Sequence, residues 1–311
     1  MAGADPRRRG KEWVSVGHGI RVPKAQIGQP LAGLRAWQPV LPGSAVFAGL
    51  TALGVHGLEL PANAARLPIF VAAGTEPGEA MPARPELIVA RHPVPPAYVL
   101  LDGVRVQPVE HAILEAARWL APLDLIALID SAVHLRTTAI RRLEAVARHR
   151  RRGNRMLRYA LGLSDGRAES SWESYLRVLH VVGGVAVTPQ VRVLGRDGRQ
   201  IARADLMIDG TRTLHEYDGE HHRRPEQHRK DLRRLADLTY NGFTCRAFVA
   251  PDLLYRPERI LAMAYDALGQ APPHRAAAGW RRMVSESLLT QSGLDSFVER
   301  AAGRSPQLRI A

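Results

Sequence analysis

The segment 202–222 reads ARADLMIDGTRTLHEYDGEHH and contains three carboxylates at spacings that could do chemistry, Asp205, Glu216 and Asp218. The Asp-Gly pair in its middle is typical of a tight turn between two strands. A two-residue loop makes Glu216 the diagonal neighbour of Asp205, and a four-residue loop places the two directly opposite each other. Because strand side chains alternate between faces, either loop leaves Asp205, Glu216 and Asp218 on one face. A three-residue loop with a bulge would break this arrangement.

Carboxylates gathered on one face of a mainly buried sheet repel one another and are costly to desolvate. A divalent cation resolves this conflict, because Mg²⁺ takes oxygen ligands and keeps several waters. Carboxylate-bound Mg²⁺ or Mn²⁺ activates water and stabilises charge at a phosphodiester. The pattern therefore predicts metal-dependent hydrolysis. The alternative is a solvated hairpin face whose acids pair with Arg203, Arg212 or Arg224.

The elements around this hairpin predict an α/β unit over residues 165–269, in the order α-β-β-β-α-β-α. Its first helix carries Ser170 and Glu173 at the spacing of a capping box. Residues 270–311 are expected to form a tail with one helix over 285–302. The expected elements of the unit are helices over 168–182, 226–240 and 256–268 and strands over 185–193, 201–208, 211–218 and 243–249.

The preceding half predicts a flexible basic arm over residues 1–19 and a mainly helical α+β domain over 20–163. Apolar residues at helical spacing indicate a helix over 41–60, with Ser44 as its N-cap. A second Asp-Gly pair predicts a hairpin. The other expected elements are strands over 67–72, 86–91, 98–101 and 104–107 and helices over 109–120, 123–134, 138–150 and 154–163.

The chain is strongly basic, with 43 Lys and Arg against 30 Asp and Glu and a formal net charge of +13. Such a surplus attracts phosphate, in nucleic acid or on anionic membranes. A GC-rich coding genome would also enrich arginine. The densest basic run, residues 147–158, is interpreted as a solvated helix end in preference to a DNA clamp.

The cysteine count and the hydropathy of the chain exclude proteins held by internal disulfides or cysteine-based zinc sites, and proteins that span a membrane. Cys245 is the only cysteine, so no disulfide within the chain and no cysteine-based zinc site can form. The chain has no apolar run of about 18 residues, the length of a membrane span. A cytoplasmic protein with no membrane partner is therefore expected.

Four segments together resemble a known family: SSWESYLR, ARADLMIDG, HEYDGEHH and QHRKDLRRLADLTYNGFTCRAF. In this order they are similar to the small nuclease-like domains related to the very-short-patch mismatch-repair endonuclease. That group belongs to the PD-(D/E)XK restriction-fold superfamily. The resemblance covers about a third of the chain and implies a restriction-endonuclease-like mixed sheet flanked by helices.

The resemblance also implies roles for the acids. Asp205 matches the metal-binding Asp of the first strand, and Glu216 matches the acid of the second. Glu173 matches the acid of the leading helix, which often completes the metal site. His221 or His222 resembles the histidine that acts as a general acid or base. The expected nucleic-acid-binding residues are Arg203, Arg224, Gln227, Lys230 and Arg234.

Two positions depart from the family pattern. The first motif reads Ala-Asp in place of Pro-Asp, and Asp218 stands where the superfamily usually has lysine. The nucleophilic water must then be handled by another group, either Lys230 or a histidine of near-neutral pKa. A role as a helix cap explains Glu173 about as well as a metal-binding role does. Gln227, Asp231 and Arg234 share one helix face, and a structural network that braces the hairpin explains them as well as DNA contact does.

Three functions remain open at this point. The leading hypothesis is a Mg²⁺- or Mn²⁺-dependent DNA endonuclease, in DNA repair or phage defence. The second is a catalytically inactive nucleic-acid-binding regulator or toxin-antitoxin component that keeps the fold, which the missing lysine favours. The third is an RNA nuclease. The text AVFAGLTALGVHGLELP resembles, over a short stretch, abortive-infection antitoxin domains fused to such nuclease-like domains.

Overall fold

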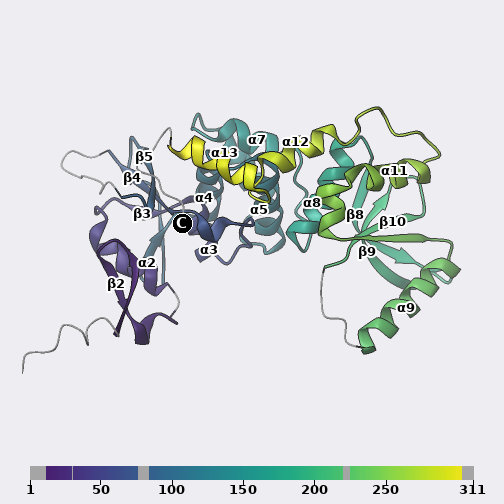
Figure 1. The fold of residues 1–311 in the computed structure, drawn as a ribbon, viewed down its shortest axis with the longest axis horizontal. Helices are drawn as coiled ribbons and strands as arrows, with labels where there is room; N and C mark the ends of the chain where they lie inside the picture. The colour runs from purple at the N-terminus through teal and green to yellow at the C-terminus, as the bar shows by residue number, and fades with distance from the viewer. Residues whose placement is uncertain (1–11, 30, 76–83, 220–224, 303–311) are drawn as a thin grey trace, which may run out of the picture.

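Two mixed β-sheets lie towards opposite ends of the molecule, with a group of helices between them (Figure 1). The computed structural model describes residues 12–29, 31–75, 84–219 and 225–302. The mixed α/β class expected from the sequence is confirmed, since both sheets combine parallel and antiparallel neighbours and are flanked by helices.

The N-terminal sheet has the strand order β5-β4-β3-β7-β6. Asp102 and Gly103 connect β6 to β7 with φ angles of 46° and 75°, the left-handed values of a two-residue primed turn. The hairpin predicted here is therefore confirmed. The elements of this end are β1 (Trp13–Gly17), β2 (Ile20–Pro23), η1 (Lys24–Gln26), α2 (Ala32–Trp37), η2 (Gln38–Val40), β3 (Val46–Phe47), η3 (Ala64–Arg66), β4 (Ile69–Gly74), β5 (Leu87–His92), β6 (Val99–Leu101) and β7 (Val104–Val106).

Helix α5 (Pro122–His134) is the centre of the helical group. It is apolar and buried around most of its circumference, which is typical of a helix enclosed by others. The apolar core continues from these helices to Leu206 and Ile208 in the C-terminal sheet. None of the described helices is long and apolar enough to cross a bilayer. The other helices of the group are α3 (Gly49–Val55), α4 (Val109–Ala116), α6 (Ile140–Arg148) and α7 (Asn154–Leu161).

The C-terminal sheet has the order β11-β10-β9-β8, with β10 and β11 parallel and the other neighbours antiparallel. Helices α8 and α9 pack on opposite faces of it. The predicted order of elements is confirmed, with α10 as an addition. The elements are α8 (Ser171–Val182), β8 (Val187–Leu194), β9 (Gln200–Ile208), β10 (Thr213–Tyr217), α9 (Pro225–Tyr240), β11 (Thr244–Phe248), α10 (Ala250–Tyr255) and α11 (Pro257–Ala267).

Two expectations for the N-terminal half are wrong. Part of the expected arm, residues 13–17, is strand β1, which pairs with β2, while residues 1–11 lie outside the described part. The expected helix over 41–60 is shorter. Its N-cap is Ala48, not Ser44, because the preceding residues form β3 between β4 and β7. Tertiary strand pairing overrides the helical periodicity here.

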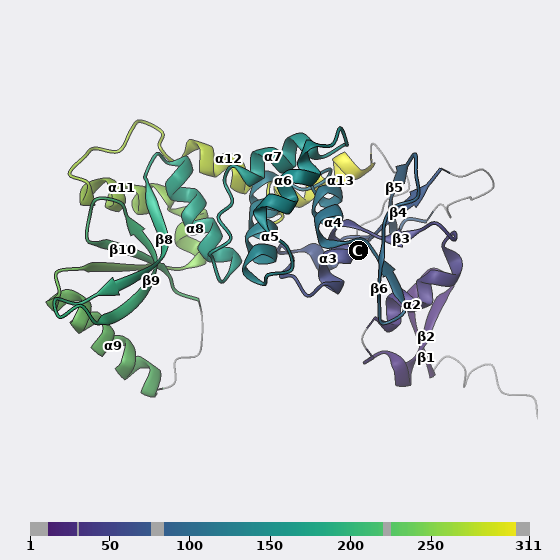
Figure 2. The same cartoon turned by 180° about the vertical axis from the view of Figure 1, so that it is seen from behind.

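The expected tail after residue 269 contains two helices in place of one, α12 (Ala278–Glu286) and α13 (Gln291–Ala302). They lead from the C-terminal sheet back across the helical group (Figures 1 and 2). Trp280 is fully buried, and the ring of Phe297 meets that of Phe70 edge-on at 6.3 Å. The backbone N–H of Leu288 donates to the buried carboxylate of Asp124 at 3.0 Å. The segment is therefore part of the core.

Replacing Phe297 by alanine tests this packing. Phe297 is 1% exposed, so we expect Phe297→Ala to lower the free energy of unfolding by about 3–5 kcal/mol. Urea denaturation followed by circular dichroism measures the change. Tyr255→Ala is the control, because Tyr255 is 73% exposed and its loss should cost less than about 0.5 kcal/mol. Equal effects of the two substitutions would contradict the packing of α13.

Candidate active site

Asp205 and Glu216 face each other across strands β9 and β10. The register pairs Leu214 with Met207 and His215 with Leu206, and its continuation sets Glu216 opposite Asp205. The connecting loop therefore has four residues, which is the second of the two even-length loops considered from the sequence. Directly opposite residues of an antiparallel pair point to the same face. This is the face covered by α9.

Asp218 follows directly after β10. Its backbone N–H donates to the carbonyl of Phe248 at 2.8 Å, which continues the pairing with β11 by one residue. Asp218 thus stays in line with Glu216, two residues before it. The structure places this third acid at the end of the strand.

The Asp205 carboxylate is half-enclosed at the end of the β9–β10 ladder. Its Oδ2 accepts a hydrogen bond from the backbone N–H of Tyr217 at 2.8 Å. Burial, followed by the negative charge of Glu173, raises the pKa of Asp205 to about 7, and Glu216 acts in the same direction. The Tyr217 N–H and Arg234 oppose this rise. Glu173 and Glu216 are therefore close enough to act on the ionisation of Asp205.

Glu216 forms a bidentate ion pair with Arg234 of α9. Arg234 Nη1 donates to Oε2 at 2.9 Å, and Nη2 donates to Oε1. The same Nη2 reaches the backbone carbonyl of Arg203 at 3.2 Å. The Glu216 side chain is 14% exposed and that of Arg234 is 34% exposed. Because planar pairing of this kind is strong and directional, Arg234 fixes α9 to the hairpin.

Two of the arginine partners expected for the hairpin acids make other contacts. Arg203 pairs with Glu169 at 2.5 Å, and Arg212 donates to the carbonyl of Asn241 at 2.8 Å. Arg224 lies outside the described residues. The distances along the chain favoured arginines near the hairpin, whereas the fold brings Arg234 to it from α9.

Glu173 acts as a cap of α8. Its backbone N–H donates to the hydroxyl of Ser170 at 3.2 Å, and its carboxylate accepts from that hydroxyl and from the backbone N–H of Glu169. Gln190 of β8 donates to it at 2.7 Å. Gln190 was not identified from the sequence, because no motif links it to the helix cap. The capping alternative for Glu173 is confirmed, and its charge still acts on Asp205.

The remaining predicted residues are spread along α9 and the segment before it. His221 and His222 lie outside the described residues, and for Gln227 only the backbone is described. Lys230 is exposed on α9. The structure therefore brings together Asp205, Glu216, Glu173 and Arg234, with Asp218 at the end of the strand.

These residues do not form a ready metal site. Within the part of the chain that the structure describes, no three His, Cys, Asp or Glu side chains are placed to hold a metal ion. Arg234 occupies both oxygens of Glu216, and Ser170, Gln190 and a backbone N–H occupy those of Glu173. The carboxylate oxygens can bind a divalent cation only if Arg234 releases Glu216.

Replacing Arg234 tests whether Arg234 and a divalent cation compete for Glu216. We expect Arg234→Ala to lower the free energy of unfolding by roughly 1–3 kcal/mol, because a largely buried carboxylate loses its partner. If the freed acids bind Mg²⁺, the ion stabilises the variant more than the wild type. Urea denaturation with Mg²⁺ or EDTA measures both effects. Arg233→Ala, at the exposed neighbouring position, is the control. If Mg²⁺ does not stabilise Arg234→Ala more than the wild type, this result counts against metal binding at these acids.

Comparison with known proteins gives relatives for part of the chain only. No protein-family model and no solved structure matches it. Two uncharacterized proteins of Mycobacterium tuberculosis, from strains CDC 1551 / Oshkosh and ATCC 25618 / H37Rv, are each 32% identical over 152 residues. The matched region is 48% of this chain and 56% of each relative, so the chain spans about half the length of the curated relatives it matches.

Proposed function

We propose that the unit from α8 to α11 is a metal-dependent endonuclease that hydrolyses DNA phosphodiester bonds with Mg²⁺ or Mn²⁺. The observation that carries the proposal is the pair Asp205 and Glu216, opposite each other on adjacent strands with Glu173 nearby. The resemblance to the very-short-patch endonucleases and their restriction fold supports it. The chain's net charge of +13 supports a polyanionic substrate.

The proposal gives each residue one task. Asp205 and Glu216 hold the cation, with Glu173 near enough to add negative charge. Bound Mg²⁺ or Mn²⁺ would supply an activated water and stabilise charge at phosphorus. Arg234 must exchange Glu216 for another anion, and a DNA phosphate suits its planar guanidinium. His221 or His222 is the proposed proton-transfer group, since a histidine titrates near neutral pH.

Cleavage of supercoiled plasmid DNA tests the proposal. We expect nicked or linear product with Mg²⁺ or Mn²⁺ and none with EDTA. Single-stranded, mismatched and nicked DNA are assayed in parallel, together with RNA. The absence of metal-dependent cleavage of every DNA substrate would overturn the proposal, and cleavage of RNA alone would replace it with an RNA nuclease.

A catalytically inactive DNA-binding regulator is the second candidate. Two observations favour it: Arg234 neutralises Glu216, and Asp218 stands in place of the family's lysine. Calorimetric titration of the DNA-bound protein with Mn²⁺ discriminates the two, because a regulator binds DNA with a steep salt dependence and takes up no ion at Asp205. If Mn²⁺ binding gives heat with the wild type and none with Asp205→Asn, the inactive regulator is excluded.

A further inference from the structure

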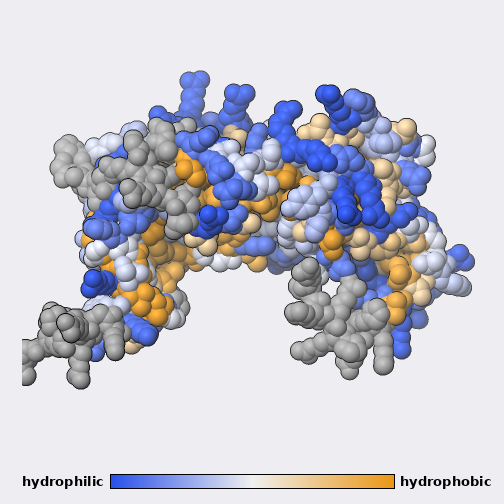
Figure 3. All heavy atoms as spheres, viewed as in Figure 1, coloured by the Kyte–Doolittle hydropathy of each residue, from blue (hydrophilic) through white to orange (hydrophobic). Residues whose placement is uncertain are grey.

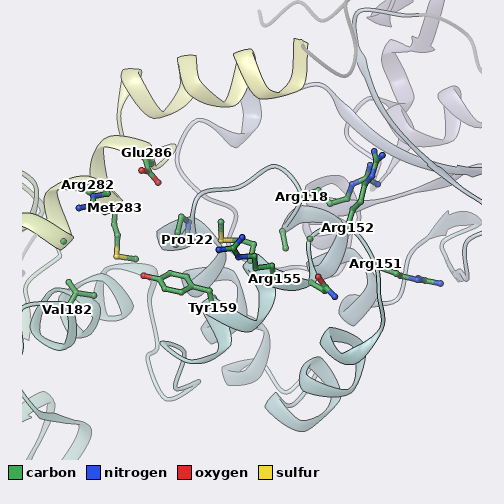
Figure 4. A pocket seen from close by; sticks show the side chains of 15 residues that line it. Arg118, Pro122, Arg151, Arg152, Arg155, Tyr159, Val182, Arg282, Met283 and Glu286 are labelled. Atoms are coloured by element: carbon green, nitrogen blue, oxygen red, sulfur yellow. The ribbon is translucent and has the colours of Figure 1, made fainter.

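A cavity of about 1150 Å³ lies away from the acids, between the α6–α7 loop, α7 and α12. Figure 4 shows its lining side chains, which come from segments far apart in the sequence. Five arginines and one acid, Glu286, are among its lining residues. The lining therefore has a large excess of positive charge. The arginines are Arg118, Arg151, Arg152, Arg155 and Arg282.

A second cavity of about 550 Å³ extends this basic surface. It shares Arg118, Arg151 and Arg152 with the first and adds Arg91 and Arg150. We call the two together the arginine groove. Hydrophilic side chains gather along the upper edge of the molecule in Figure 3, where Figure 1 places α7 and α12. Arg118 is largely buried and pairs with Glu115, but Arg150, Arg151, Arg152, Arg155 and Arg282 are exposed. Several exposed guanidinium groups along one groove suit a chain of phosphates better than one small anion.

Apolar side chains share the lining with these arginines. Tyr159 is 52% exposed, and Met283 comes from α12 on the other side of the cavity (Figure 4). Pro122, Met156 and Val182 add to the apolar part. Proteins that bind single strands combine a basic groove with an aromatic platform on which bases stack. A duplex keeps its bases stacked inside and offers none to Tyr159.

We propose that the arginine groove binds single-stranded nucleic acid, with phosphates on Arg151, Arg152, Arg155 and Arg282 and a base stacked on Tyr159. The basic run was interpreted from the sequence as a solvated helix end. The structure shows in addition that this run lines a cavity, that α12 lies opposite it, and that the ring of Tyr159 is exposed there. This site uses none of the acids on β9 and β10, so it does not depend on the proposed endonuclease activity.

Fluorescence anisotropy with a labelled oligothymidine tests the site, in EDTA so that no metal-dependent cleavage occurs. The variant Arg151→Ala/Arg155→Ala is compared with Arg141→Ala/Arg259→Ala, which removes two exposed arginines elsewhere. We expect the groove variant to bind at least about tenfold more weakly, with a salt slope lower by about 1.4 for two lost phosphate contacts. Equal weakening in the control would overturn the proposal.

Tyr159 supplies the second readout. We expect Tyr159→Ala to weaken binding about tenfold and Tyr159→Phe to preserve it, because stacking needs the ring and not the hydroxyl. Tyr255→Ala is the matched control at an exposed tyrosine outside the groove. Unchanged binding by Tyr159→Ala, or tighter binding of duplex DNA, would overturn the proposal. A parallel titration with oligouridine shows whether the bound strand is DNA or RNA. Asp205→Asn should bind as the wild type does, which separates this site from the proposed nuclease.

Discussion

Asp205→Asn is expected to reduce metal-dependent DNA cleavage by at least about 100-fold, because it removes a proposed ligand of the cation. Asparagine has the shape of aspartic acid, so it can still accept the hydrogen bond from the Tyr217 N–H. Its amide can also donate to the nearby carboxylates. The variant should therefore fold, and a plasmid-nicking time course with a matched unfolding curve measures activity and stability together.

The control is Asp209→Asn, the same change on the same hairpin. Asp209 lies in the exposed turn, where its carboxylate accepts from the hydroxyl of Thr188 at 2.7 Å. We expect its cleavage rate to stay within about twofold of the wild type, since it is outside the acid pair. A nicking rate in Asp205→Asn equal to that of the control would remove these acids from the reaction. A loss of activity in both variants would indicate damage to the hairpin.

The acid pair could be predicted from the sequence because its geometry depends on local rules. Strand alternation and an Asp-Gly turn determine which residues share a face, and the observed register sets Asp205 opposite Glu216 as a four-residue loop requires. Helix α8 was likewise marked by Ser170 and Glu173 at capping spacing, and Ser170 is its N-cap. Both features involve residues near one another in the chain.

The features that the sequence left open or missed depend on distant contacts. A network that braces the hairpin is one of two explanations that the sequence offers for Arg234, and the packing of α9 on the sheet identifies its partner as Glu216, 18 residues away. The helices after residue 269 bury Trp280 and Phe297 against parts of the chain that precede the C-terminal sheet. Spacing along the sequence contains no information on which face a later helix covers, so these contacts required the structure.

A buried histidine pair connects α8 to the sheet on the face opposite the acids. His180 Nδ1 lies 2.8 Å from the carbonyl of Leu176, so this nitrogen must carry the proton. His180 Nε2 then accepts from His215 Nδ1 at 2.9 Å. His215 Nε2 is buried and has no hydrogen-bond partner among the described residues, and Phe248 meets its ring edge-on. Both rings are therefore neutral in the folded chain.

Acid is expected to destabilise the protein through this pair. Burial lowers the pKa of His180 from 6.5 to about 4. Burial, followed by the neighbouring His180 and Arg246, lowers the pKa of His215 to about 2. Between pH 6.5 and 4 the unfolded chain binds a proton that the folded chain does not, so stability falls as the pH falls. For His180 alone the loss at about pH 5 is roughly 2 kcal/mol relative to neutral pH.

The double variant His180→Leu/His215→Phe isolates this contribution from that of the carboxylates. Removing both partners leaves no unpaired donor, and the helix carbonyl of Leu176 keeps its backbone bond, so the variant should fold. Urea denaturation at neutral pH and at about pH 5 should give the variant a loss smaller by at least roughly 2 kcal/mol than that of the wild type. An identical loss in the two proteins would mean that these histidines bind protons in the folded state, and their hydrogen bonds would then have to be different from those described.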